Sequence, residues 1–121
     1  MKMDYHFMLS LFHLLFVAPL FLGIGFFRSQ IPYWLYHLIL IIGISIALYH
    51  GYRLLMRMRK GSNYAWVNAF HLLLVAPLLI YIGIKKYDTP RAAYELLLIS
   101  GFGAAGYHLY NLINNLNTES Q

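Results

Sequence analysis

An internal repeat constrains the fold of this chain more than any other feature. Residues 12–54 match residues 70–112 without a gap, 58 positions later, and nearly half of the aligned residues are identical. The repeated motifs are Phe-His-Leu-Leu, Val-Ala-Pro-Leu and a Tyr-His pair near the end of each copy. A repeated segment of this length indicates that the chain is built from two equivalent structural units.

The composition is typical of a membrane protein. Hydrophobic residues make up 60% of the chain and charged residues only 11%, whereas about a quarter of an ordinary soluble domain is charged. The charged residues separate four apolar runs, each long enough to cross a hydrocarbon core of about 30 Å as a helix. These runs cover residues 5–27, 32–52, 64–84 and 92–112. The sequence therefore predicts an all-α, integral membrane four-helix bundle.

The repeat also predicts how the spans are organised. Each copy carries two spans, so the chain should consist of two tandem, parallel-oriented transmembrane hairpins, residues 1–60 and 61–121, related by a pseudo-twofold axis along the membrane normal. An even number of spans places both termini on one side. The densest basic cluster, Arg57 to Lys60, favours the cytoplasm-like side for the termini and for that loop.

The net charge of +5 is explained by this topology and by anionic lipid headgroups. We therefore expect the lipid bilayer to be the main partner, and nucleic acid is not needed to account for the charge. Association with further copies or with a larger membrane assembly is left open by the sequence.

Small residues recur on one face of the second and fourth spans. Gly43 and Ala47 in the first copy match Gly101 and Ala105 in the second, on a stripe with heptad spacing. Small residues let membrane helices approach closely, so this stripe predicts helix packing; room for a flat cofactor is the alternative.

Prolines recur within the first and third spans. Pro19 and Pro77 cannot donate a backbone hydrogen bond and clash with the preceding turn. They are predicted to kink these two helices. A carbonyl released by such a kink, close to a histidine, could also form a polar site.

Four histidines are kept in both copies, and they are the candidate cofactor-binding residues: His13, His50, His71 and His108. Counting from the predicted hairpin turns places all four at similar depth, in a belt within the terminus-side half of the bilayer. A histidine within a membrane span needs a polar partner and indicates a functional site. Three roles follow: hydrogen-bonding glue between helices, ligands of haem b or a metal of undetermined identity, or part of a proton or ion path.

The residues that several classes of chemistry require are absent from the sequence. The chain has no cysteine, which excludes disulfides, thiolate ligands and thiol nucleophiles. No Ser-His-acid set, paired carboxylates or glycine-rich phosphate loop is present, so no catalytic residue is predicted.

The pattern Phe-His-Leu-Leu-x-Val-Ala-Pro-Leu, followed by a turn with proline and a span ending in Tyr-His, resembles short uncharacterised multi-span membrane proteins of large DNA viruses of algae and protists. That resemblance carries over no catalytic residues. We expect a non-enzymatic membrane protein: a scaffold, an assembly subunit or a virion-membrane component. Two alternatives are an electron-transfer protein, with haem b held by two histidines as in b-type cytochromes, and a small proton or ion channel or transporter.

Overall fold

The computed structural model describes residues 5–63 and 65–119, and within that part the chain is helical with no strand. Four long helical segments follow one another along the chain, two of them interrupted by short changes of helix type. The elements are α1 (Tyr5–Phe12), η1 (His13–Val17), α2 (Ala18–Phe27), η2 (Arg28–Gln30), α3 (Tyr33–Arg59), α4 (Ala65–Phe70), η3 (His71–Val75), α5 (Ala76–Lys85), η4 (Lys86–Asp88) and α6 (Arg91–Glu119). The fold class is thus all-helical, as the sequence predicted.

Each of the four segments is long and apolar enough to cross a membrane. The candidate spans are Phe7–Gln30, Tyr33–Arg59, Ala65–Asp88 and Arg91–Asn117. Each one contains most of a predicted apolar run, and the second and fourth helices continue well beyond the predicted ends of their runs. The length and composition of these helices therefore suit a membrane protein with four spans.

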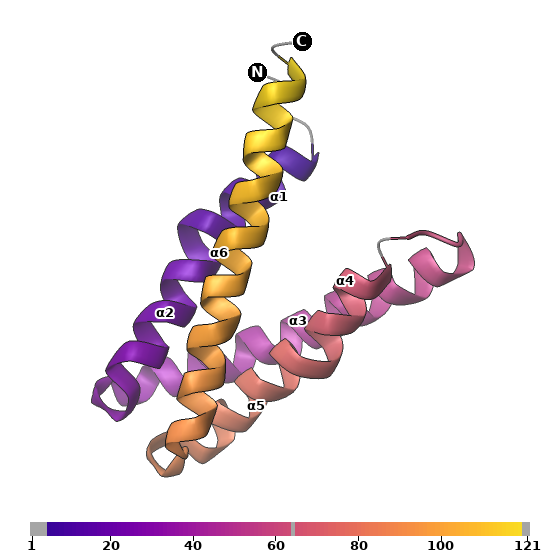
Figure 1. The fold of residues 1–121 in the computed structure, drawn as a ribbon. Helices are drawn as coiled ribbons and strands as arrows, with labels where there is room; N and C mark the ends of the chain where they lie inside the picture. The colour runs from indigo at the N-terminus through magenta and orange to yellow at the C-terminus, as the bar shows by residue number, and fades with distance from the viewer. Residues whose placement is uncertain (1–4, 64, 120–121) are drawn as a thin grey trace. The chain divides into compact units, whose positions relative to one another are not determined.

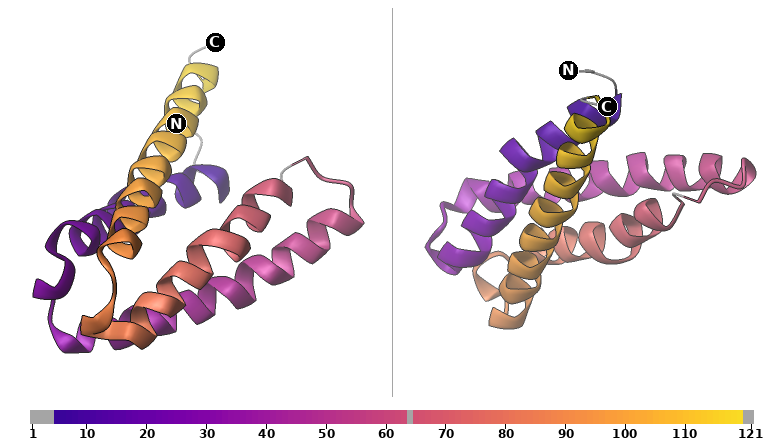
Figure 2. Two further views of the ribbon diagram at one scale, coloured as in Figure 1. Left: turned by 60° about the horizontal axis from the view of Figure 1, so that its bottom comes forward. Right: turned by 45° about the horizontal axis from the view of Figure 1, so that its top comes forward.

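Two compact units make up the structure, and each is described by itself. Unit 1 consists of Met1–Arg28 and Tyr94–Gln121, and unit 2 consists of Ser29–Ala93. In unit 2, α3 runs along α4, η3 and α5 as an antiparallel pair, which can be followed in Figures 1 and 2. In unit 1 the first helical segment of the chain packs with the last one, α6.

The units therefore combine helices from different copies of the repeat. Each contains the first span of one copy and the second span of the other. The division into hairpins 1–60 and 61–121 concerns the order of the spans across a membrane, and it stays a prediction.

The repeated prolines follow a local change of helix type. Residues His13–Val17 and His71–Val75 form π-helical turns, and the N–H groups of Ala18 and Ala76 donate to the carbonyls five residues earlier. The α-helix resumes at these alanines, so each proline falls in the first turn of a new α-helix. The predicted kinks at Pro19 and Pro77 stay predictions, and the π-turns are the feature observed beside them.

The chain leaves α2 and α5 through equivalent turns. Arg28 and Lys86 have positive φ values of 55° and 54°, an uncommon conformation for residues other than glycine. At the second turn the Thr89 hydroxyl donates to the Lys86 carbonyl at 2.6 Å. The same carbonyl also accepts the backbone N–H of Thr89 at 3.1 Å, so two bonds from Thr89 hold this turn.

Glycines allow the two helices of unit 2 to pack at short distance. A Cβ atom added to Gly83 would lie 2.8 Å from the Leu40 Cα, and one added to Gly43 would lie 3.0 Å from the backbone nitrogen of Ile80. Because backbone atoms line both contacts, a side chain could be accommodated only if a helix moved away.

Unit 1 has the same two contacts at equivalent positions. A Cβ atom on Gly25 would lie 2.9 Å from the Tyr94 carbonyl oxygen, and one on Gly101 would lie 3.0 Å from Leu22 side-chain atoms.

Gly43 and Gly101 of the predicted stripe are buried, and Ala47 and Ala105 are half-buried. Gly25 and Gly83, which complete the contacts, were not singled out from the sequence.

Replacing Gly83 with alanine should lower the free energy of unfolding by about 1–3 kcal/mol, because the methyl group overlaps the α3 backbone. Gly51→Ala is the matched control within the same unit, since its nearest neighbour is the end of the Leu72 side chain at 3.9 Å. Thermal unfolding in detergent measures both. A Gly83→Ala protein as stable as the control would contradict the close helix approach.

Candidate functional site: paired histidines

The four histidines shared by the two copies of the repeat meet as two pairs, one within each unit. In unit 2, the ring of His50 on α3 stacks on the ring of His71, the first residue of η3, with centroids 4.2 Å apart and planes inclined by only 10°. Both rings are half-buried. The two imidazole rings pack face to face, so their contact joins the two helices directly.

The Nδ1 atoms of this pair have identified partners. His71 Nδ1 lies 2.7 Å from the carbonyl oxygen of Val67, one helical turn earlier. His50 Nδ1 lies 2.8 Å from Oδ1 of Asn68. A carbonyl oxygen can only accept, so His71 Nδ1 carries the proton, and a neutral His71 ring has its lone pair on Nε2.

Asn68 links the two helices of unit 2. It lies on α4, is 3% exposed and bonds to a histidine on α3. Its amide nitrogen has no hydrogen-bond acceptor among the described residues. An unsatisfied buried N–H group lowers the free energy of unfolding. The presence of Asn68 despite this cost fits a role in orienting His50.

Unit 1 contains the equivalent pair. The rings of His13 and His108 stack with centroids 4.2 Å apart and planes inclined by 22°. His13 Nδ1 lies 2.8 Å from the carbonyl oxygen of Leu9, as His71 Nδ1 does from the corresponding carbonyl in unit 2. Ser10, which is 4% exposed, occupies the repeat position of Asn68. The two pairs thus share the ring stack and the bond from one histidine to its own helix. They differ in this polar neighbour and in burial, because His13 and His108 are buried whereas His50 and His71 are half-buried.

An aromatic side chain from each helix contacts the histidine next to it in sequence. In unit 2 the edge contacts are Phe70 with His71, at 6.0 Å between centroids, and Tyr49 with His50, at 5.1 Å. Phe12 and Tyr107 make the same contacts with His13 and His108. We call each set a four-ring cluster: phenylalanine, two stacked histidines and tyrosine. These contacts restrict how far either imidazole can turn.

Both clusters lie toward one end of their helices. In unit 2, His71 is six residues from the start of its span and His50 is nine residues from the end of its own. At 1.5 Å per residue these positions are about 9 and 14 Å from the helix ends.

Of the four predicted cofactor-binding histidines, the structure brings His13 together with His108 and His50 together with His71. A single belt containing all four stays a prediction. Within the described residues, no group of three or more His, Cys, Asp and Glu side chains is placed to hold a metal ion.

Comparison with known proteins provides no family assignment. No family model, no curated protein and no solved structure matches the chain. The function is therefore argued from the geometry of the chain itself.

Replacing His71 with phenylalanine should lower the free energy of unfolding by about 0.6–2 kcal/mol, the range for polar contacts between membrane helices. The variant keeps a ring for stacking and removes the bond to Val67. His37→Phe is the control, because His37 is an exposed histidine whose ring contacts Tyr33 only at its edge. Equal thermal stability of the two variants in detergent would show that the histidine pair does not hold the helices together.

Proposed function

We propose that this chain is a small, non-enzymatic membrane protein with four spans, in which the histidine pairs fasten helices to one another. It would serve as a scaffold, an assembly subunit or a component of a virion membrane. The observation that carries this proposal is the large amount of apolar side-chain surface that the described helices leave uncovered.

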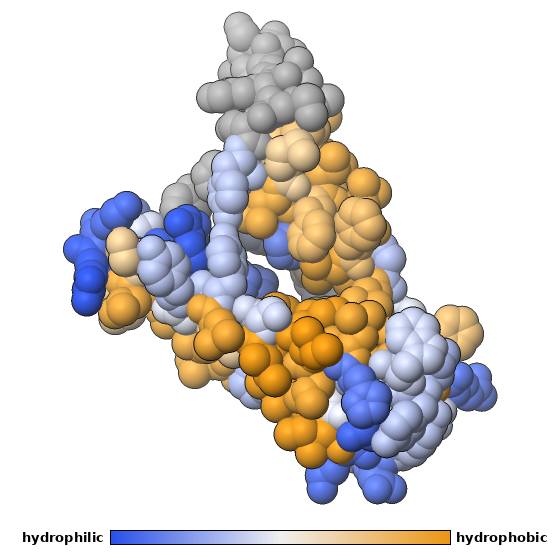
Figure 3. Space-filling model, turned by 180° about the vertical axis from the view of Figure 1, so that it is seen from behind, coloured by the Kyte–Doolittle hydropathy of each residue, from blue (hydrophilic) through white to orange (hydrophobic). Residues whose placement is uncertain are grey.

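The exposed apolar residues lie along the proposed spans. Leu15, Leu48, Leu73, Ile99 and Phe102 are all more than half exposed, at 60–76%. Figure 3 shows hydrophobic residues over much of the visible surface, with hydrophilic residues gathered in separate areas. Exposure on this scale is unfavourable in water, and lipid acyl chains would cover it.

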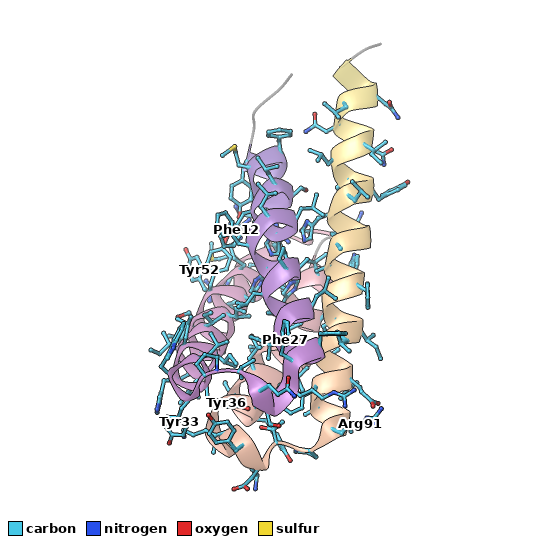
Figure 4. The ribbon with its side chains drawn as sticks, turned by 90° about the vertical axis from the view of Figure 1, so that its left-hand side faces the viewer. Phe12, Phe27, Tyr33, Tyr36, Tyr52 and Arg91 are labelled. Atoms are coloured by element: carbon cyan, nitrogen blue, oxygen red, sulfur yellow. The ribbon has the colours of Figure 1, made fainter. Side chains whose placement is uncertain are left out.

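Aromatic side chains at the helix ends support insertion in a bilayer. Tyr33 and Trp34 at the start of α3 are 51% and 63% exposed, and Tyr52 near its other end is 61% exposed. Figure 4 shows Tyr33 and Tyr52 on α3 and Arg91 at the start of α6. Tyrosine and tryptophan concentrate at membrane–water interfaces, so their placement fits a helix whose ends reach the headgroups.

The contacts of the histidines support a structural role. In each pair the rings from two helices lie against each other, and in unit 2 His50 on α3 also bonds to Asn68 on α4. Histidines that bond across helices stabilise membrane bundles without chemistry. A virion-membrane component is the form of this function that the resemblance to proteins of large DNA viruses favours.

A haem b protein is the second candidate. It is supported by the protonated Nδ1 of His13 and His71, because ligating histidines normally donate that proton to a carbonyl or carboxylate. A haem iron, however, takes its two axial histidines from opposite faces of the macrocycle. Rings stacked at 4.2 Å would have to separate to admit it, so the geometry favours the structural role.

Visible absorption of the purified protein discriminates between these two functions. We expect a colourless preparation that gains no sharp band at the blue end of the visible spectrum after incubation with haem. A stoichiometric band that shifts on reduction, and that is lost in the His13→Ala or His71→Ala variant, would replace the structural proposal with electron transfer.

The membrane topology can be tested with single cysteines, because the natural chain has none. We expect Asn63→Cys to react with a membrane-impermeant thiol reagent from one side, and Ser29→Cys and Asp88→Cys from the other. Exposure of all three positions in the structure makes them suitable sites. Labelling of the three cysteines from the same side, or extraction of the protein from membranes by alkaline carbonate, would contradict the proposal.

A further inference from the structure

We propose that the end of α3 in unit 2 binds the phosphate headgroup of an anionic lipid. The site consists of Arg53, Arg57, Arg59 and Lys60, and we call it the basic end of α3. This inference rests on the proposed insertion of the helices in a bilayer and adds a particular class of lipid to it. Three observations carry it: the position of the charges, the lack of carboxylates in the same unit, and a comparison of the two copies of the repeat.

The basic end of α3 is regular helix closed by an ordered turn. α3 continues to Arg59, and the turn that follows bonds its last carbonyls. The N–H of Ser62 donates to the Arg57 carbonyl at 2.9 Å, and the N–H of Gly61 donates to the Met58 carbonyl at 3.2 Å. Gly61 has a positive φ of 67°, the conformation in which glycine commonly ends a helix. The arginines therefore stand at the fixed spacing of an α-helix.

The position of these residues along α3 matches the headgroup layer of a bilayer. The apolar run ends at Tyr52, which is 61% exposed, and tyrosine is typical of the membrane–water interface. From Tyr52 the helix continues to Arg59, a length of about 10 Å at 1.5 Å per residue. Headgroups extend roughly 5–8 Å beyond the hydrocarbon core on each side. The basic residues would therefore lie at the level of the lipid phosphates.

The positive charges at this end have no carboxylate within unit 2 to balance them. Asp88 is the only acidic residue among residues 29–93, and it lies in η4, next to Tyr87, whose ring contacts Tyr33 at the other end of α3. Like charges one helical turn apart, such as Arg53 and Arg57, repel each other. A phosphate group has the opposite charge and accepts from a guanidinium through two oxygens. A lipid phosphate would thus supply the anion that unit 2 lacks.

The second copy of the repeat provides an internal comparison. With the same offset of 58 residues, positions 53, 57 and 59 correspond to positions 111, 115 and 117 on α6, where all three residues are asparagine. Burial agrees in the two copies, because the first two positions are half-buried and the third is exposed in both. α6 nevertheless continues to Glu119. A helix extension of this length therefore does not require arginine, which indicates that the arginines of α3 serve in binding.

The two tryptophans allow lipid preference to be measured at each end of unit 2. Trp66 lies near the start of α4, after the turn that follows the basic end, and Trp34 lies at the start of α3. The full chain carrying either Trp34→Phe or Trp66→Phe is reconstituted in mixed vesicles of phosphatidylcholine and phosphatidylglycerol, with one or the other lipid brominated. Bromine quenches the fluorescence of a tryptophan that it contacts, so the ratio of the two quenching values measures the local preference between the headgroups.

We expect phosphatidylglycerol to be preferred more strongly at the tryptophan of the basic end than at the other. Each basic residue near an anionic surface contributes about 1 kcal/mol, or about fivefold in binding. Arg53→Gln combined with Arg57→Gln should therefore reduce the preference at least fivefold, and glutamine is as good a helix former as arginine. Lys85→Gln combined with Lys86→Gln removes the same charge from the other end and should leave this preference unchanged. Equal preference at the two tryptophans, or an unchanged preference in the arginine variant, would overturn the proposal.

Quenching by brominated phosphatidylcholine separates this site from the proposed function. If neither lipid quenches either tryptophan, the helices do not contact lipid, and the proposed membrane protein fails together with the site. If both lipids quench both tryptophans without preference, insertion stands and the headgroup site alone is refuted. Saturable binding of a short RNA without any lipid preference would assign the same charges to a soluble polyanion, and would also overturn the proposal.

Discussion

The close approach of the helix backbones at glycine is the constraint on which each unit depends. In unit 2, Gly83 lies where any Cβ would meet the backbone of Leu40 at 2.8–2.9 Å. Contact of this kind fixes the register of α5 against α3. A shift of one residue rotates a helix by about 100°, which would separate His71 from His50. The stacked histidines therefore depend on glycines about two to three turns away, and bulk at the glycines should disturb the histidine site.

Much of the fold follows from the sequence because apolar runs and charges report directly on membrane-length helices. The four segments were predicted, and their starts agree closely with the structure. The end of α3 was not predicted, because apolarity ends near Arg53 whereas the helix continues to Arg59. Leucine, methionine and arginine in this stretch are all good helix formers. A prediction based on apolarity alone therefore ends the helix too early, at the point where α3 would leave the proposed membrane.

The candidate site was predicted only in part, since a repeat identifies equivalent residues and says nothing about which helices pack together. The four histidines could be nominated, but the pairing of His50 with His71 depends on tertiary contacts. Asn68 and Ser10 lie just outside the matched segment and were missed. A polar residue at the same position in both copies, three residues before a histidine, was the available signal. The π-turns could not be predicted from the pattern of apolar residues. The prolines were the one feature that pointed to this part of the helices.

Each compact unit is built from one helical segment of each copy of the repeat, and so are the contacts within it. Each histidine pair contains one residue from each copy, His13 with His108 and His50 with His71. The glycine contacts follow the same rule, because Gly83 meets the helix of Gly43, and Gly25 meets the helix of Gly101. One copy alone would supply one half of each contact, as a subunit does at a twofold interface. The covalent link between the copies thus provides both partners at a fixed stoichiometry, and it allows the two histidine pairs to differ, as they do at Asn68 and Ser10 and in burial.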